Sequence, residues 1–168
     1  MTTIPSPLPP ASVADFRDGM ALLPGAVNIV TTDGPGGRAG FTASAVCSVT
    51  DSPPSLLVCL NRGSSAAGAF AANDALCVNT IGPAHLTIAR AFGGKTPMPE
   101  RFEGATWATK VTGAPVLDGA TVAFDCRITQ RHSVGTHDIL ICEIHDVATS
   151  TGTDVAVYQA RKFHTLAG

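Results

Sequence analysis

Charged and aromatic residues are scarce in this sequence. Only 14% of its 168 residues are Asp, Glu, Lys or Arg and 5% are aromatic, whereas 45% are hydrophobic. A soluble domain usually carries about a quarter charged residues, and a short chain has a large surface to cover. Burial of part of that surface in an oligomer, most often a two-fold dimer, would explain the shortage. A surface rich in Ala, Gly, Ser and Thr is the alternative, and we favour the oligomer.

The sequence also lacks a concentration of charge of one sign. The formal net charge is −2, with neither a basic block nor an acidic tail, which argues against nucleic acid as a partner. No apolar stretch approaches the length of a membrane span, and Met1–Pro7 lacks the basic segment and apolar run of a signal peptide. We therefore expect a cytoplasmic protein without a membrane partner.

Paired cysteine motifs and the common nucleotide and nucleophile motifs are absent. The five cysteines are Cys47, Cys59, Cys77, Cys126 and Cys142. Their odd number and the lack of a Cys-x-x-Cys pair argue against a zinc site and a disulfide framework, so we expect buried, reduced thiols. The five histidines show no metal-ligand spacing with carboxylates. No Gly-x-Gly-x-x-Gly loop, Walker loop or Gly-x-Ser-x-Gly elbow is present.

Hydrophobic periodicity predicts a mainly β domain with a few short helices. Residues 1–11 hold four prolines and no periodic pattern, so we expect a mobile arm before one domain over 12–168. Val13, Phe16, Met20 and Leu23 predict an amphipathic helix over 12–23. Strands are expected at 26–32, 40–50, 55–61, 75–80, 121–129, 137–147 and 155–158, and helices at 65–73 and 83–90. Many short strands with few helices indicate a closed or sandwiched β-structure.

The segment from Asn61 to Ser65 is the first candidate site. It joins a strand to an Ala-rich helix and combines Arg62, a flexible Gly63 and the hydroxyls of Ser64 and Ser65. A helix start with free amides, a cation and hydroxyl donors suits a phosphate group. An ordinary serine N-cap beside a surface arginine is the alternative, and it is the more frequent case for such a segment alone.

Three further segments could contribute to a site. Gly40–Thr50 carries small and hydroxylated residues where a strand would normally be bulky, which leaves room for a flat ligand or for a close neighbouring strand. His137 follows a glycine turn and could act near a reactive ring, although a surface histidine is more frequent. The loop Ala91–Lys95 could cover a ligand or be a simple connector.

Taken in order, these segments resemble a known family. The runs Gly40–Ala45 and Ser48–Val49, then Pro53–Arg62, Cys77–Asn79, Phe92–Gly94, Gly113–Leu117 and Gly135–His137, are similar to the short-chain flavin reductases of two-component monooxygenases. The resemblance runs from about Phe16 to Leu166. Ala45–Pro54, Phe92–Thr96 and Gly135–Leu140 resemble the members that serve pyrimidine degradation. Thr136 stands where many members have Asp.

The resemblance implies a split β-barrel homodimer with a flavin site near the subunit boundary. It implies an NAD(P)H-dependent reductase that reduces FMN, with FAD as an option, and passes free reduced flavin to a monooxygenase of uracil degradation. A partner that oxidises phenols or other aromatics, and a non-catalytic FMN-binding module, are the alternatives. His137 would lie on the nicotinamide side, with NADH or NADPH as the donor. The implied flavin contacts are Thr42, Ala43, Ser44, Ala45, Ser48, Val49, Asn61, Arg62, Ser64, Ser65, Phe92 and Gly93.

Overall fold

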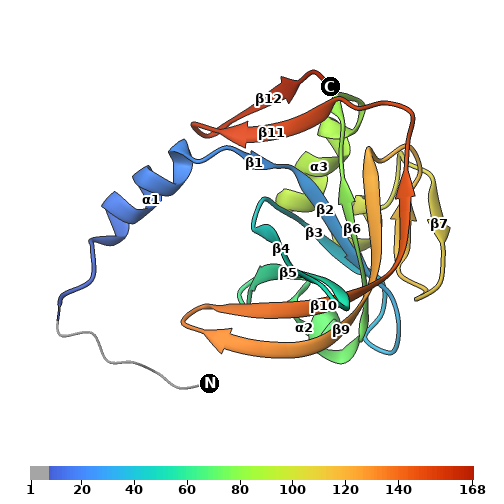
Figure 1. Cartoon of the computed structure of the whole chain (residues 1–168), viewed down its shortest axis with the longest axis horizontal. Coiled ribbons are helices and arrows are strands. Elements are labelled where there is room, and N and C mark those ends of the chain that lie inside the picture. The colour runs from blue at the N-terminus through green and yellow to red at the C-terminus, as the bar shows by residue number, and fades with distance from the viewer. Residues whose placement is uncertain (1–7) are drawn as a thin grey trace.

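β-Strands make up most of the regular structure of residues 8–168, the part of the chain that the computed structural model describes (Figure 1). Most of the expected N-terminal arm, residues 1–7, lies outside the described residues. The largest sheet has seven antiparallel strands, and its two edge strands are consecutive in the chain. In spatial order they are β3 (Ala39–Ala43), β2 (Asn28–Thr32), β6 (Ala75–Thr80), β9 (Val122–Val134), β10 (His137–Thr149), β5 (Pro54–Asn61) and β4 (Val46–Asp51).

Closure of this sheet follows from the link between its edges. Only Ser44 and Ala45 separate β3 from β4, so the end of the first strand and the start of the last must meet at one corner. The amide of Cys59 on β5 donates to the carbonyl of Ala45 at 3.1 Å, which extends the β4–β5 ladder up to this corner. Two register shifts in the pairing of β10 with β9 supply the bending that a closed sheet needs. The result is the split β-barrel that the sequence predicts.

Both faces of the central strands are covered. β2 is buried along its whole length and β6 nearly so. One face packs inside the barrel, where Val30 and Val78 meet Val58 and Leu140. The other face packs Ile29 against helix α3 (Leu86–Gly93) and against the ribbon of β7 (Trp107–Thr109) and β8 (Pro115–Leu117). The helix is therefore held rigidly against the strands that lead to β3.

The structure corrects two predicted strands, one where the chain crosses between sheets and one where it passes from one edge of the large sheet to the other. The expected strand 26–32 is β1 (Gly25–Ala26) followed by β2, because Val27 leaves a small sheet to enter the barrel. That small sheet pairs β1 with β11 (Val155–Gln159) and β12 (Lys162–Leu166). The expected strand 40–50 breaks at Ser44–Ala45 into β3 and β4.

The other predicted elements are present with shifted ends, and four elements were not foreseen. The helices expected at 65–73 and 83–90 are α2 (Ala67–Ala72) and a 3-10 turn, η1 (Pro83–His85), that runs into α3. The strands expected at 121–129 and 137–147 extend further, into the long hairpin of β9 and β10. The unforeseen elements are α4 (Met98–Arg101), β7, β8 and β12.

The helix expected at 12–23 is α1 (Val13–Leu22), and it projects from the barrel rather than covering it (Figure 1). None of its residues is buried, and Val13, Phe16 and Met20 are each at least half exposed. Its C-terminal half is fixed to the β11–β12 turn, by bonds from the Ala160 amide to the Ala21 carbonyl at 2.6 Å and from Gln159 Nε2 to the Leu22 carbonyl at 3.1 Å, and by an ion pair between Arg161 and Asp18.

The cysteines only partly follow the expected pattern. All five are free thiols, and Cys77, Cys126 and Cys142 are buried as expected. Burial raises the pKa of Cys142 to about 12. The expectation is wrong for Cys47, which is exposed on edge strand β4, and for Cys59, which is only half-buried. For Cys47, an apolar sequence context does not bury a side chain on an edge strand that is exposed along nearly its whole length. None of the helices in residues 8–168 is long and apolar enough to cross a membrane.

Candidate functional site

A polar pocket of about 530 Å³ lies where the edges of the barrel meet. Four parts of the chain form it: the β3–β4 corner, the end of β5 with the following turn, the end of α3, and the start of β10. Most of the residues named from the sequence come together here. They are Thr42, Ala43, Ser44, Ala45, Asn61, Ser64, Ser65, Phe92, Gly93 and His137. Phe41, Cys59, Leu60, Gly63, Gly94 and Arg101 also line the pocket.

Three residues named from the sequence do not line this pocket. Ser48 and Val49 are exposed further along β4. The Arg62 guanidinium turns to the tip of the β9–β10 hairpin, where it donates to the carbonyls of His137 (3.0 Å) and Gly135. It also forms an ion pair with Asp138 at 3.1 Å. Arg62 therefore fastens the end of β5 to the hairpin in this structure.

The turn before α2 is organised by its own side chains. The Gly63 amide donates to Asn61 Oδ1 at 2.8 Å, and the Ala66 amide donates to Ser64 Oγ at 3.2 Å. α2 begins only at Ala67, and its N-cap residue Ala66 has no capping side chain. The serines therefore stand one turn before the helix, and Ser65 Oγ instead accepts a bond from Arg101.

Arg101 is the residue of the polar pocket that sequence reasoning missed. It is 4% exposed, and its Nη2 donates to Ser65 Oγ at 3.0 Å and to the Gly94 carbonyl at 3.2 Å. Nη1 and Nε donate only to the backbone carbonyls of Gly40, Phe92 and Thr96. Among residues 8–168, no carboxylate forms an ion pair with it.

A buried cation without a counter-charge is costly unless an anion binds beside it. Arg101 is held at the pocket wall by α4, which starts after Pro97, and by carbonyls from three separate segments. This arrangement gives the serine end of the polar pocket a fixed positive potential. That end can therefore bind an anion, and a phosphate group matches its mixture of cation and hydroxyls.

The opposite end of the polar pocket is built from small side chains and free backbone amides. Ser44 and Ala45 lie between strands, and within residues 8–168 their amides donate to no backbone carbonyl. Such amides are obligatory donors that a ligand can satisfy. His137 also lines the pocket and lies opposite Asn61 in the β5–β10 register. Its Nδ1 lies 2.9 Å from Thr136 Oγ1, so a hydroxyl holds the imidazole ring.

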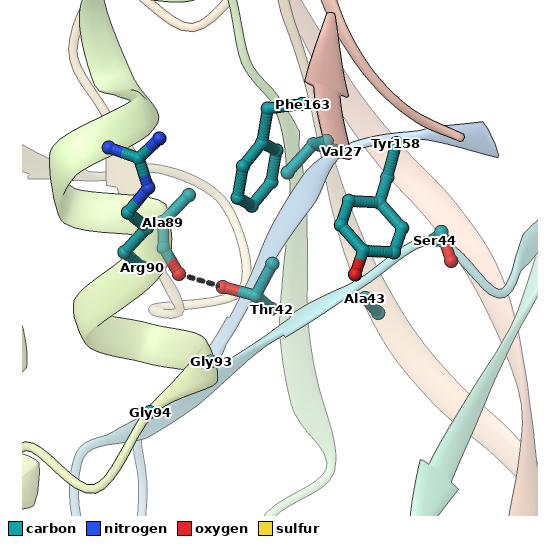
Figure 2. Close-up of a pocket in the computed structure, with 10 residues that line it drawn as sticks. All are labelled: Val27, Thr42, Ala43, Ser44, Ala89, Arg90, Gly93, Gly94, Tyr158 and Phe163. Atoms are coloured by element: carbon teal, nitrogen blue, oxygen red, sulfur yellow. Dashed lines mark hydrogen bonds between the residues drawn. The ribbon is translucent and has the colours of Figure 1, made fainter. Parts of the chain in front are cut away.

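A second cavity of about 370 Å³, the aromatic pocket, adjoins the first (Figure 2). The two cavities share Thr42–Ser44 of β3 and Gly93–Gly94 at the end of α3. Thr42 Oγ1 donates to the Ala89 carbonyl at 2.6 Å and fastens the helix to the strand. The remaining lining residues are Val27, Ala89, Arg90, Tyr158 and Phe163.

The flavin reductase like domain family matches residues 20–167 of the chain. The FMN reductase (NADH) RutF of Stutzerimonas stutzeri is 61% identical over 152 residues, which cover 90% of this chain and 87% of that protein. RutF of Pseudomonas syringae pv. syringae is 56% identical over 164 residues, which cover 96% of this chain and 92% of that protein.

Solved structures match over a similar length. A candidate flavin reductase of Haemophilus somnus has a TM-score of 0.89 and 47% identity, over 93% of this chain and all of the other. The NADH:FAD oxidoreductase SgcE6 of Streptomyces globisporus, solved with NAD and FAD fragments, has a TM-score of 0.83 over 92% of each chain. At 23% identity, that likeness shows the shared fold alone.

Asp138 at the hairpin tip should titrate below its ordinary range. The Ser133 hydroxyl donates to this carboxylate at 2.6 Å and Arg62 donates at 3.1 Å, and both interactions lower its pKa. The pKa is then lower in the folded than in the unfolded chain, so the stabilisation is present at neutral pH and is lost as pH falls through the lowered value. Carboxyl NMR titration should show the Asp138 pKa rising in Ser133→Ala. A wild-type Asp138 that titrates at its ordinary value would contradict this.

Proposed function

The chain belongs to the flavin reductase like domain family, and from this premise we propose that it is an NADH-dependent FMN reductase. It reduces FMN and releases the reduced flavin to a partner monooxygenase of pyrimidine degradation, a reaction that we place in the cytoplasm. The observation that carries the proposal is the buried, carboxylate-free Arg101 at one end of a pocket whose other end is lined by small residues and free amides. The names of the 61% and 56% identical relatives support the same reaction.

The two ends of the polar pocket match the two chemically different ends of FMN. FMN has a charged phosphate at one end and a flat ring with polar edge atoms at the other. Arg101, Ser64 and Ser65 form the phosphate end, and charge-assisted hydrogen bonds there distinguish FMN from riboflavin. Thr42–Ala45 form the ring end, where the free amides of Ser44 and Ala45 can donate to the edge of the ring.

The chemistry requires alignment more than acid–base catalysis. Bound FMN supplies a ring that accepts a hydride from NADH, and the protein contributes binding, orientation and exclusion of water. His137 lines the pocket with its ring held by Thr136, so its other nitrogen, Nε2, can donate a hydrogen bond to the nicotinamide nucleotide. Because hydride transfer itself needs no protein acid, the lack of an acid–base cluster at the pocket agrees with the proposal.

We also propose that the chain is a homodimer with the flavin site near the subunit boundary. The exposed apolar residues of α1 and the low charge content both indicate that a second copy covers part of this surface. Replacing Phe16 and Met20 together by Asp should therefore convert the dimer to a monomer in sedimentation velocity. A wild-type chain that is monomeric at micromolar concentration and fully active would contradict the dimer.

Replacing Arg101 should separate FMN from riboflavin. Arg101→Gln removes the cation of the phosphate end and should weaken FMN binding by about 1.5–3 kcal/mol, whereas riboflavin, which has no phosphate, should keep its affinity. Arg62→Gln is the matched control, because Arg62 points to the hairpin and should leave both affinities unchanged. Flavin fluorescence titration measures all of these values. If Arg62→Gln selectively weakened FMN and Arg101→Gln did not, the phosphate would belong to Arg62, as the sequence suggested.

Replacing His137 should affect the nicotinamide substrate alone. His137→Ala removes one hydrogen bond to NADH and should raise the KM for NADH by an amount worth about 1 kcal/mol, with unchanged FMN affinity. Steady-state NADH oxidation in the presence of FMN gives both values, and parallel assays with NADPH and FAD establish the preferences. An unchanged KM for NADH would make His137 a surface residue without a ligand contact.

A further inference from the structure

We propose that Arg62 is a positioning residue, which holds the hairpin turn that carries His137 so that the imidazole ring faces the nicotinamide nucleotide. This inference rests on the proposed function, because it concerns the substrate that His137 contacts in that reaction. The guanidinium, which the sequence suggested for a phosphate, serves the hairpin instead.

Arg62 forms a hydrogen bond with each of the four residues from Gly135 to Asp138. Its backbone amide donates to the Thr136 carbonyl at 3.0 Å. Its guanidinium donates to the carbonyls of Gly135 and His137, the latter at 3.0 Å, and to Asp138 Oδ1 at 3.1 Å. The turn therefore cannot move relative to the end of β5 without breaking several hydrogen bonds at once.

The hairpin tip has little else to hold it. Only Gly135 and Thr136 separate β9 from β10, and Gly135 has a φ of +55°, in the left-handed region that glycine tolerates. Residues 133–137 are all exposed, so the tip is not fixed by burial of its side chains. Exposed turns of this kind open more readily than a packed core. The hydrogen bonds of Arg62 supply a restraint that packing does not.

Asp138 and Ser133 hold the guanidinium in turn. The two residues are register partners across the hairpin, and the Ser133 hydroxyl donates to Asp138 Oδ1 at 2.6 Å. The same oxygen accepts from Arg62, whose planar fork of donors reaches a carboxylate and two carbonyls together. The guanidinium is thereby committed to the hairpin, and Arg62 does not line the polar pocket.

His137 connects the restrained turn to the polar pocket. It lines the pocket, whereas Thr136 and Asp138 do not. The imidazole is fixed through its Nδ1 by the Thr136 hydroxyl, so the direction of the ring follows the backbone that Arg62 holds. A ring that drifts loses its hydrogen bond to the nicotinamide nucleotide, while the flavin contacts on β3 stay in place. Arg62 should therefore affect NADH without contacting it.

A double-mutant cycle on Arg62 and His137 tests the inference. Arg62→Gln should raise the KM for NADH by up to about fivefold, because a positioning residue cannot cost more than the one hydrogen bond that it positions. In the His137→Ala background, Arg62→Gln should raise this KM no further. The kcat at saturating NADH and the affinity for FMN should stay unchanged, and the unchanged FMN affinity also shows that each variant is folded.

Two further variants calibrate the cycle. Arg62→Lys keeps the charge beside Asp138 but loses the planar fork, so its KM for NADH should fall between those of the wild type and Arg62→Gln. Arg127→Gln is the matched control, because Arg127 lies earlier on β9 and forms its ion pair with Asp74 at 2.9 Å. It should leave the KM for NADH unchanged in both backgrounds.

The imidazole ring of His137 gives a readout apart from turnover. Two-dimensional NMR of protein labelled with 15N-histidine should show the His137 ring signals shifting in Arg62→Gln. The signals of His85 on η1 and His164 on β12 should stay in place, because neither residue lies on the hairpin. Arg127→Gln should leave the His137 signals where they are in the wild type.

Four results would overturn the inference. They are an unchanged KM for NADH in Arg62→Gln, an equal rise with and without the His137 side chain, an unchanged KM in His137→Ala, and a selective loss of FMN affinity in Arg62→Gln. The last would show that Arg62 supports the turn at Asn61–Ser65 instead. Wild-type protein that binds FMN but never oxidises NADH would refute the proposed function itself, which is a different result.

Discussion

The joining of the two barrel edges by only Ser44 and Ala45 is the constraint on which the rest of the site depends. Two residues cannot span an open sheet of seven strands, so β3 and β4 must meet, and the amides at the junction are left outside both ladders. The same closure brings the end of β5 and the start of β10 beside β3. A cavity bounded by backbone and small side chains results, and β3 on one side of it is held against the fully buried strand β2.

Arg101 makes one end of this cavity positively charged, so the two ends differ chemically. A buried guanidinium that donates only to carbonyls and one hydroxyl remains a net positive charge in a poorly hydrated wall. This charge favours binding of the phosphate end of a nucleotide beside Arg101. The opposite end has no charge, which suits a ring that must meet a second ring.

The sequence predicts those parts of the structure that depend on neighbouring residues. β6 runs over the expected residues 75–80, and the turn at Asn61–Ser65 and the small residues at Thr42–Ala45 reach the pocket because each segment is local and continuous. The breaks at Val27 and Ser44–Ala45 could not be predicted, since they depend on which strand comes to lie alongside. Arg101 could not be found either, because its partners Gly40 and Ser65 are distant in sequence. For Arg62 the local sequence was misleading. The motif suggested that Arg62 binds a phosphate, but its partners in the structure lie on the β9–β10 hairpin, which is distant in sequence.

The central claim is that this chain transfers hydride from NADH to FMN rather than merely binding flavin. Anaerobic stopped-flow mixing of the FMN-loaded protein with NADH tests it most directly, because no oxygenase partner is needed and oxidised flavin is followed by its own absorbance. The account predicts complete bleaching of the oxidised flavin, at a rate that saturates with NADH and far exceeds that of free FMN. Flavin that binds stoichiometrically and stays oxidised at saturating NADH would contradict it and leave a non-catalytic FMN-binding module.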